Sequence, residues 1–110
     1  MKVIILGKYT YEQLSAVMEE LIESSQCYLF TVVCGSTEKK MPVGSLSEIW
    51  ALNNGAPINY IIESDVNKLI DEIVKTADFV LAFYDGEDAI VRRVIMKMKG
   101  EGKHGKVVNV

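Results

Sequence analysis

The sequence predicts one α/β domain over residues 1–110, in which a five-stranded, mainly parallel sheet lies between two layers of helices. Two observations support this three-layer α/β/α class. Short, continuous apolar runs alternate along the whole chain with segments of helical periodicity, and the segments between them are only a few residues long. Continuous apolar runs are typical of strands buried on both faces, and strict alternation with amphipathic helices indicates parallel strands joined by helical crossovers. At 110 residues, the chain can bury one core without disulfides or metals.

The first strand is expected over residues 2–6, an apolar run that ends at Gly7. Thr10 and Gln13 have the spacing of a capping box, which predicts the start of a helix. The apolar stripe of that helix is Leu14, Val17, Met18, Leu21 and Ile22. The second strand is expected over residues 27–33, which are rich in β-branched and aromatic side chains.

Ser45 and Glu48 repeat the capping-box spacing and predict a second helix, which ends at the Asn54-Gly55 pair. The side chains expected to face inward from it are Leu46, Ile49 and Trp50. A third strand is expected over residues 58–62, after Pro57.

Asp65 is a good N-cap for a third helix. Its apolar stripe is Val66, Leu69, Ile70, Ile73 and Val74. The fourth strand is expected over residues 79–84. A fourth helix follows, with Val91, Val94, Ile95 and Met98 at helical spacing. It ends near Gly100, and the last strand is expected over residues 106–110.

Composition and charge exclude several classes of function. The net charge of −3 and the lack of a concentrated basic face argue against nucleic acid as a partner. No apolar run approaches the roughly 18 residues needed to span a bilayer, so we expect a cytoplasmic protein without a membrane partner. Two cysteines, Cys27 and Cys34, are too few for a zinc site by themselves and are expected on opposite faces of one strand, which makes a disulfide implausible. We expect no metal and no cofactor.

Candidate site residues lie in three loops, because ligands of open parallel sheets bind outside the carboxyl ends of the strands. The loops follow the first, second and fourth strands. The candidate binding residues are Gly7, Lys8, Tyr9, Cys34, Gly35, Ser36, Thr37, Asp85 and Gly86, and the candidate catalytic residues are Asp85, Glu87 and Asp88. Cys34, at the end of a strand and facing a helix N-terminus, could have a lowered pKa, although a small buried side chain is the more common role.

A resemblance to a known family rests on three segments in order. They are Val-Val-Cys-Gly-Ser at 32–36, Glu-Ile-Trp-Ala at 48–51 followed by Asn-Asn-Gly-Ala-Pro-Ile, and Ala-Asp-Phe-Val-Leu-Ala-Phe-Tyr-Asp-Gly at 77–86. With these segments the chain resembles the SLOG superfamily, in particular its small YspA-like branch. The resemblance implies a Rossmann-like fold and a nucleotide or nucleotide-derived ligand held at the ends of strands one, two and four.

The chain departs from this family in its loops. Gly7-Lys8-Tyr9 stands where members usually have Gly-Ser-Arg, so the arginine is absent, and Lys8 as its replacement cannot make the two-pronged phosphate contact of a guanidinium. Glu87 and Asp88 stand where members have a glycine and a threonine at the start of a helix. Carboxylates there satisfy the helix dipole themselves and would repel a phosphate. Helix capping is therefore one interpretation of these two residues, and acid-base catalysis or binding of ribose hydroxyls is the other.

Three hypotheses about function follow. The first is a module that binds a nucleotide-derived small molecule. The second is a degenerate, non-catalytic module of a phage or mobile element that acts through protein contacts, with an exposed apolar face joining two copies in a homodimer. The third is an enzyme that cleaves or transfers N-glycosidic bonds, as the resemblance to phosphoribohydrolases and deoxyribosyltransferases suggests, with Asp85, Glu87 or Asp88 as nucleophile or acid.

Overall fold

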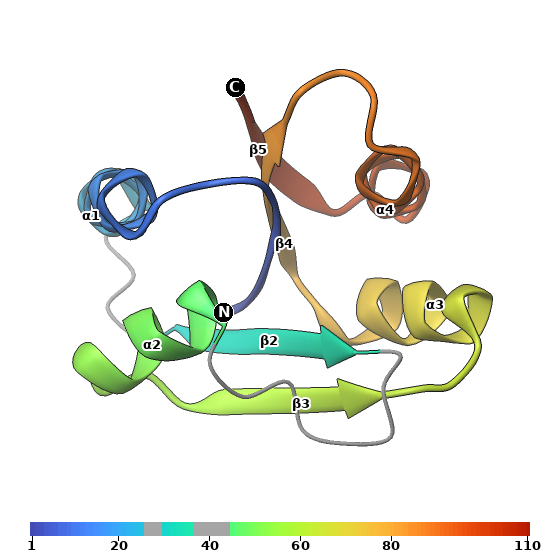
Figure 1. Cartoon of the computed structure of the whole chain (residues 1–110), viewed down its shortest axis with the longest axis horizontal. Helices are drawn as coiled ribbons and strands as arrows, with labels where there is room; N and C mark the ends of the chain where they lie inside the picture. Colours follow the sequence, from blue (N-terminus) through green and yellow to red (C-terminus); the bar gives the residue numbers. More distant parts are fainter. Residues whose placement is uncertain (26–29, 37–44) are drawn as a thin grey trace.

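A computed structural model describes residues 1–25, 30–36 and 45–110 and has an α/β fold of the Rossmann-like type (Figure 1). Its five strands form one parallel sheet in the order β3-β2-β1-β4-β5. The strands are β1 (Lys2–Gly7), β2 (Thr31–Ser36), β3 (Ile58–Ile62), β4 (Phe79–Tyr84) and β5 (His104–Asn109). The helices are α1 (Tyr11–Ser25), α2 (Leu46–Asn53), α3 (Val66–Thr76) and α4 (Ala89–Gly100). The predicted fold class is confirmed.

The apolar strands divide their side chains between two cores. Val3 and Ile5 of β1 belong to the core under α1 and α2, whereas Ile4 belongs to the core under α3 and α4. Val32 and Val33 of β2 alternate in the same way. This alternation is the reason why continuous apolar runs mark strands that are covered on both faces.

The helices begin where the sequence predicts. The capping box of α1 is reciprocal, because the backbone N–H of Thr10 donates to Gln13 Oε1 and that of Gln13 donates to Thr10 Oγ1. Ser45 Oγ accepts from the backbone N–H of Glu48 at the start of α2, and Asp65 Oδ1 accepts from that of Asn67 at α3. The buried side chains of α1, α3 and α4 all come from the predicted stripes.

Three local expectations are wrong. β2 continues through Gly35 and Ser36, which were expected in a loop, because these residues pair with Ile61 and Ile62 of β3. In α2, Ile49 is exposed, and the buried side chains are Ser47, Glu48, Trp50 and Ala51. β5 is also longer than expected, since His104 already pairs with Phe79 of β4.

The order of the strands places a topological switch point between β1 and β4. From β1 the chain proceeds outward through β2 to β3, and it then crosses to β4 and proceeds outward to β5 on the other side. Ligands of such sheets bind outside the carboxyl ends of the strands near this point. None of the helices in the described ranges is long and apolar enough to cross a membrane.

Candidate functional site

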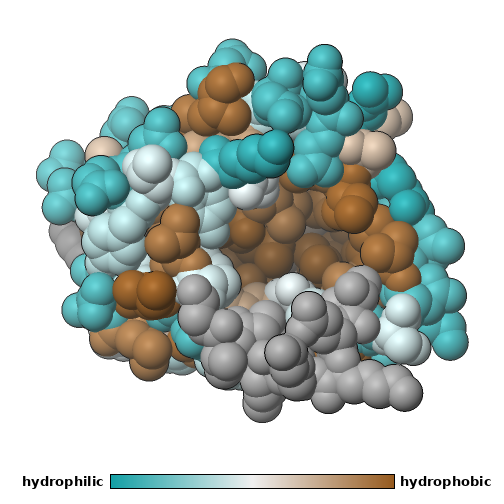
Figure 2. All heavy atoms as spheres, viewed as in Figure 1, coloured by the Kyte–Doolittle hydropathy of each residue, from teal (hydrophilic) through white to brown (hydrophobic). Residues whose placement is uncertain are grey.

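A pocket of about 250 Å³ lies at the carboxyl ends of β1 and β2, next to the switch point. Figure 2, seen from the same side as Figure 1, shows a hydrophobic hollow near the centre of this face, beside α3 and α4. The described residues that line the pocket come from the two strands, from the segment between β1 and α1, from the N-cap and first turn of α2, and from α3 and α4. They are Ile4, Ile5, Leu6, Tyr9, Val33, Cys34, Gly35, Ser45, Ser47, Leu69, Ile73 and Ile90.

The pocket has one apolar side and one polar side. Leu69 and Ile73 of α3, with Ile90 at the start of α4, belong to the apolar side. Gly35 keeps this side open, because a Cβ at that position would lie 3.1 Å from Ile73 Cδ1 and 3.3 Å from Leu69 Cδ1. A side chain at position 35 would therefore crowd the pocket.

The polar side consists of hydroxyl and thiol groups that contact one another. Ser47 Oγ lies 3.7 Å from Cys34 Sγ and 3.3 Å from Ser45 Oγ. Burial raises the pKa of the Tyr9 hydroxyl, and hydrogen bonding to Ser47 offsets part of that shift. The Tyr9 ring itself packs against Phe83, with the ring centroids 4.8 Å apart. Tyr9 is thus fixed on one side by an aromatic contact and on the other by α2.

Cys34 has the environment of a structural cysteine. Burial raises the pKa of its thiol above the ordinary value, and hydrogen bonding to Ser47 and Ser45 only partly opposes this. This agrees with the more common role, a small buried side chain at the end of a strand, and not with the alternative of a lowered pKa. A neutral thiol is a weak donor and acceptor and a poor nucleophile.

Behind the polar side lies a buried carboxylate, Glu48, whose spacing from Ser45 in the sequence indicates only a capping box. Glu48 is 6% exposed, and its carboxylate accepts a hydrogen bond from the Tyr60 hydroxyl. This interaction raises the pKa of Tyr60 to about 12. No local pattern in the sequence marks the pair, because Glu48 lies on α2 and Tyr60 lies 12 residues further along the chain, on β3.

The structure separates the predicted site residues into two groups. Tyr9, Cys34 and Gly35 come together at the pocket. Ser36 pairs with β3 at the end of β2, and Thr37 lies outside the described residues. Gly7 is not among the pocket residues, and its backbone has a φ of +100°. A Cβ on Gly7 would lie 1.9 Å from the Phe83 carbonyl oxygen, so close packing of β1 on β4 by itself requires glycine there.

The loop after β4 forms a second group outside the pocket. Asp85 Oδ1 accepts from the backbone N–H groups of Glu87 and Asp88 at 2.8 and 3.1 Å, and these bonds lower the pKa of Asp85. Lys8 contributes a smaller lowering by its charge. Gly86 has a φ of +90° in the turn between them. The loop is thus organised around its own carboxylate.

Asp88 is the N-cap of α4, as the capping interpretation predicts. Its Oδ1 accepts from the backbone N–H groups of Ile90 and Val91 at 3.0 and 3.2 Å. Glu87 is exposed. Asp85, Glu87 and Asp88 are absent from the described pocket lining, and so this lining holds no carboxylate that could act as a nucleophile or acid.

Two larger cavities occur elsewhere, and neither has the position of a ligand site. One of about 530 Å³ lies between the ends of α3 and α4, and one of about 510 Å³ lies between α4 and β5. The first is lined by Lys75, Glu101 and Lys103 among others, at the helix ends that lead to the amino-terminal edge of the sheet. The described residues contain no cluster of three or more His, Cys, Asp or Glu side chains that could hold a metal.

Comparisons with known proteins add no relative: no protein-family model matches the chain, and no curated protein does.

Proposed function

We propose that this protein is a binding module for a nucleotide-derived small molecule and that the ligand enters the pocket at the carboxyl ends of β1 and β2. The single observation that carries the proposal is the position of this pocket next to the switch point, with an apolar and a polar side. Ligand pockets combine hydrophobic walls with a few convergent polar groups in this way. The resemblance to the SLOG superfamily, which covers nearly the whole chain, supplies the nucleotide-derived class of ligand.

The size of the pocket limits which part of the ligand it holds. Its volume of about 250 Å³ is below the roughly 300–1,000 Å³ of pockets for drug-sized molecules. A nucleobase with part of its sugar is therefore a better match than a whole dinucleotide. The remainder of a larger ligand would extend over the adjacent strand ends.

Calorimetry with adenosine, AMP, ADP-ribose and NAD tests the proposal directly. We expect at least one of them to bind with a Kd below about 1 mM, which corresponds to about 4 kcal/mol. Absence of heat for all four at millimolar concentration would contradict the proposal.

A matched pair of variants tests the location. Ile90 lines the pocket and is 47% exposed, so Ile90→Trp adds bulk at the opening of the pocket. Met96 lies on the same helix, is 65% exposed and does not line the pocket. We expect Ile90→Trp to weaken binding about tenfold or more, a loss of at least about 1.4 kcal/mol, and Met96→Trp to leave it unchanged within about twofold. Equal affinities of the two variants would place the ligand elsewhere.

A further inference from the structure

We propose that the pocket recognises the uncharged base and sugar of its ligand and leaves any phosphate in solvent. This inference rests on the proposed function and deepens it, because it names the chemistry by which the ligand is selected. Such a pocket differs from nucleotide sites in which backbone N–H groups bind the phosphate and thereby hold the nucleotide. Three observations support it.

The first observation is the composition of the pocket wall. Every described residue that lines it is uncharged: the side chains are aliphatic, except for the Tyr9, Ser45 and Ser47 hydroxyls and the Cys34 thiol, and Gly35 has none. A phosphate in such a pocket would lose its hydration without gaining a cation. A neutral heteroaromatic ring loses much less, because its faces are apolar.

The second observation is that the helix N-termini around the site already hold acceptors from the protein. At α4, which starts at the switch point, Asp88 Oδ1 accepts hydrogen bonds from two backbone N–H groups. In the preceding turn, Asp85 Oδ1 accepts hydrogen bonds from two more. At α1, Thr10 Oγ1 accepts from the backbone N–H of Gln13 at 3.2 Å. Phosphates in open α/β sheets bind to such backbone groups, so these positions are taken, and two carboxylates at α4 would also repel the anion.

At α2, the N-terminus next to the pocket is likewise occupied. Ser45 Oγ accepts from the backbone N–H of Glu48 at 3.2 Å, and the Glu48 side chain is buried within the first turn. Among the described residues, the start of α2 therefore holds a serine cap and a buried carboxyl side chain, and Lys8 and Arg92, which lie near the starts of α1 and α4, are not among the residues that line the pocket.

The third observation is that the pocket has a polar side opposite an apolar side. The hydroxyls of Ser45 and Ser47 can each donate and accept, which suits the edge of a base or the hydroxyls of a sugar. Leu69, Ile73 and Ile90 provide apolar contact for the face of a ring. This arrangement selects by shape and neutral hydrogen bonds.

The experiment compares a nucleoside with its own 5′-monophosphate, for example adenosine with AMP, by calorimetry on the full chain at 50 and 200 mM salt. We expect the two Kd values to agree within about threefold at both salt concentrations, because a phosphate held by charge-assisted hydrogen bonds would tighten binding about tenfold or more. We also expect Ser47→Ala to weaken both ligands equally, by about two- to tenfold for one lost hydrogen bond. Ser24→Ala, at the far end of α1, is the matched control.

The outcomes separate this inference from the proposed function. AMP binding about tenfold or more tighter than adenosine, with the advantage lost at 200 mM salt, would overturn the inference and leave the proposed function standing. A Ser47→Ala loss confined to AMP would overturn it too. No binding of either ligand, nor of ADP-ribose or NAD, would contradict the proposed function and the inference together.

Discussion

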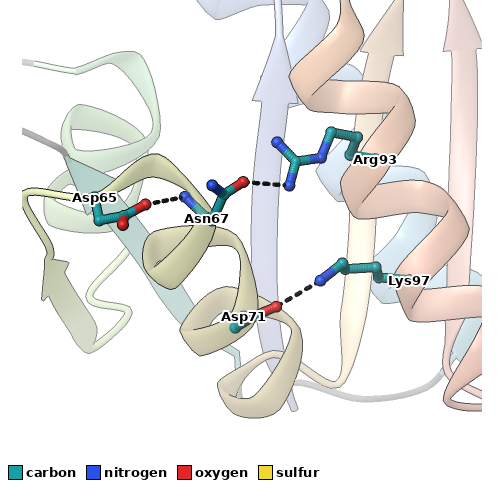
Figure 3. A network of polar contacts seen from close by, with 5 residues as sticks. All are labelled: Asp65, Asn67, Asp71, Arg93 and Lys97. Carbon is teal, nitrogen blue, oxygen red and sulfur yellow. Dashed lines mark hydrogen bonds and ion pairs between the residues drawn. The ribbon is translucent and has the colours of Figure 1, made fainter.

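The two faces of the sheet differ in where their polar side chains lie. Under α3 and α4 the core is apolar throughout, and the polar contacts between these helices lie on the outside, where Arg93 Nη2 donates to Asn67 Oδ1 at 2.6 Å and Lys97 Nζ donates to Asp71 Oδ1 at 2.5 Å (Figure 3). Under α1 and α2 the polar groups lie inside. Ser47 and Glu48 are buried there and contact Cys34 and Tyr60.

This difference indicates what each face does. Buried polar groups destabilise a fold unless they are fully hydrogen-bonded, so an apolar core with an exposed polar rim is the better arrangement for stability alone. On the α1–α2 face, the buried polar side chains of the described residues are Ser47 and Glu48 of α2, and Ser47 lines the pocket. The α3–α4 face therefore follows the arrangement that favours stability alone, whereas the α1–α2 face carries buried polar groups beside a pocket whose apolar side comes from α3 and α4.

The largest expected effect comes from placing a carboxylate in the apolar face. Val94 of α4 is fully buried, and a glutamate there would have no partner. We expect Val94→Glu to lower the free energy of unfolding by about 4 kcal/mol at pH 7, because the side chain must bind a proton far above its ordinary pKa. Urea denaturation measures this loss.

Met96→Glu is the matched control, because Met96 lies two residues further along the same helix and is exposed. We expect it to change the free energy of unfolding by about 0.5 kcal/mol or less. If Val94→Glu and Met96→Glu lowered the free energy of unfolding by similar amounts, the buried position of Val94 would not be the cause of the loss.

An intermediate effect is expected from removing the carboxylate that the α1–α2 face already contains. Glu48→Ala leaves the Tyr60 hydroxyl without this acceptor at a buried position, and we expect a loss of about 1–3 kcal/mol in the free energy of unfolding. Glu72→Ala, on the exposed side of α3, should change it by about 0.5 kcal/mol or less. If the two variants lowered the free energy of unfolding equally, the hydrogen bond between Glu48 and Tyr60 would not stabilise the fold.

The same pair has a pH signature. The pKa of Tyr60 is about 12 in the folded protein and 10.0 ordinarily, so this interaction stabilises the fold fully below pH 10 and loses its effect as the pH rises through about 12. In Glu48→Gln we expect the Tyr60 titration to move down toward about 10. Phenolate absorbance, read as the difference from Tyr60→Phe, follows this titration, and an unchanged midpoint would contradict the role of Glu48.

Sequence patterns predicted the α3–α4 face more completely than the α1–α2 face. In α3, the spacing from Leu69 to Val74 identifies every buried side chain, because only apolar burial decides which side faces the sheet. In α2, the same reasoning selected Ile49, yet Ser47 and Glu48 are buried instead. A buried carboxylate depends on a partner from another strand, and hydrophobic periodicity carries no information about such a pair.

The site shows the same division. The general rule for parallel sheets identified Tyr9, Cys34 and Gly35, because the carboxyl ends of strands necessarily share one edge. It could not tell that β2 continues through Gly35, since pairing with β3 decides where a strand ends. The capping interpretation of Asp88 came from local spacing, which is information that a sequence does contain.

The smallest expected effect comes from the exposed polar contacts of the α3–α4 face. In Lys97→Met, the ion pair between Lys97 and Asp71 is lost, and because their side chains are 45% and 63% exposed, we expect a change of about 0.2–1 kcal/mol that shrinks further in 1 M salt. Lys99→Met removes a charge from the same helix without removing this pair and serves as the control. Thermal denaturation at low and high salt compares the two. A loss for Lys97→Met as large as that for Glu48→Ala would overturn the division between the faces, because stability would then depend on the outer polar contacts as much as on the inner ones.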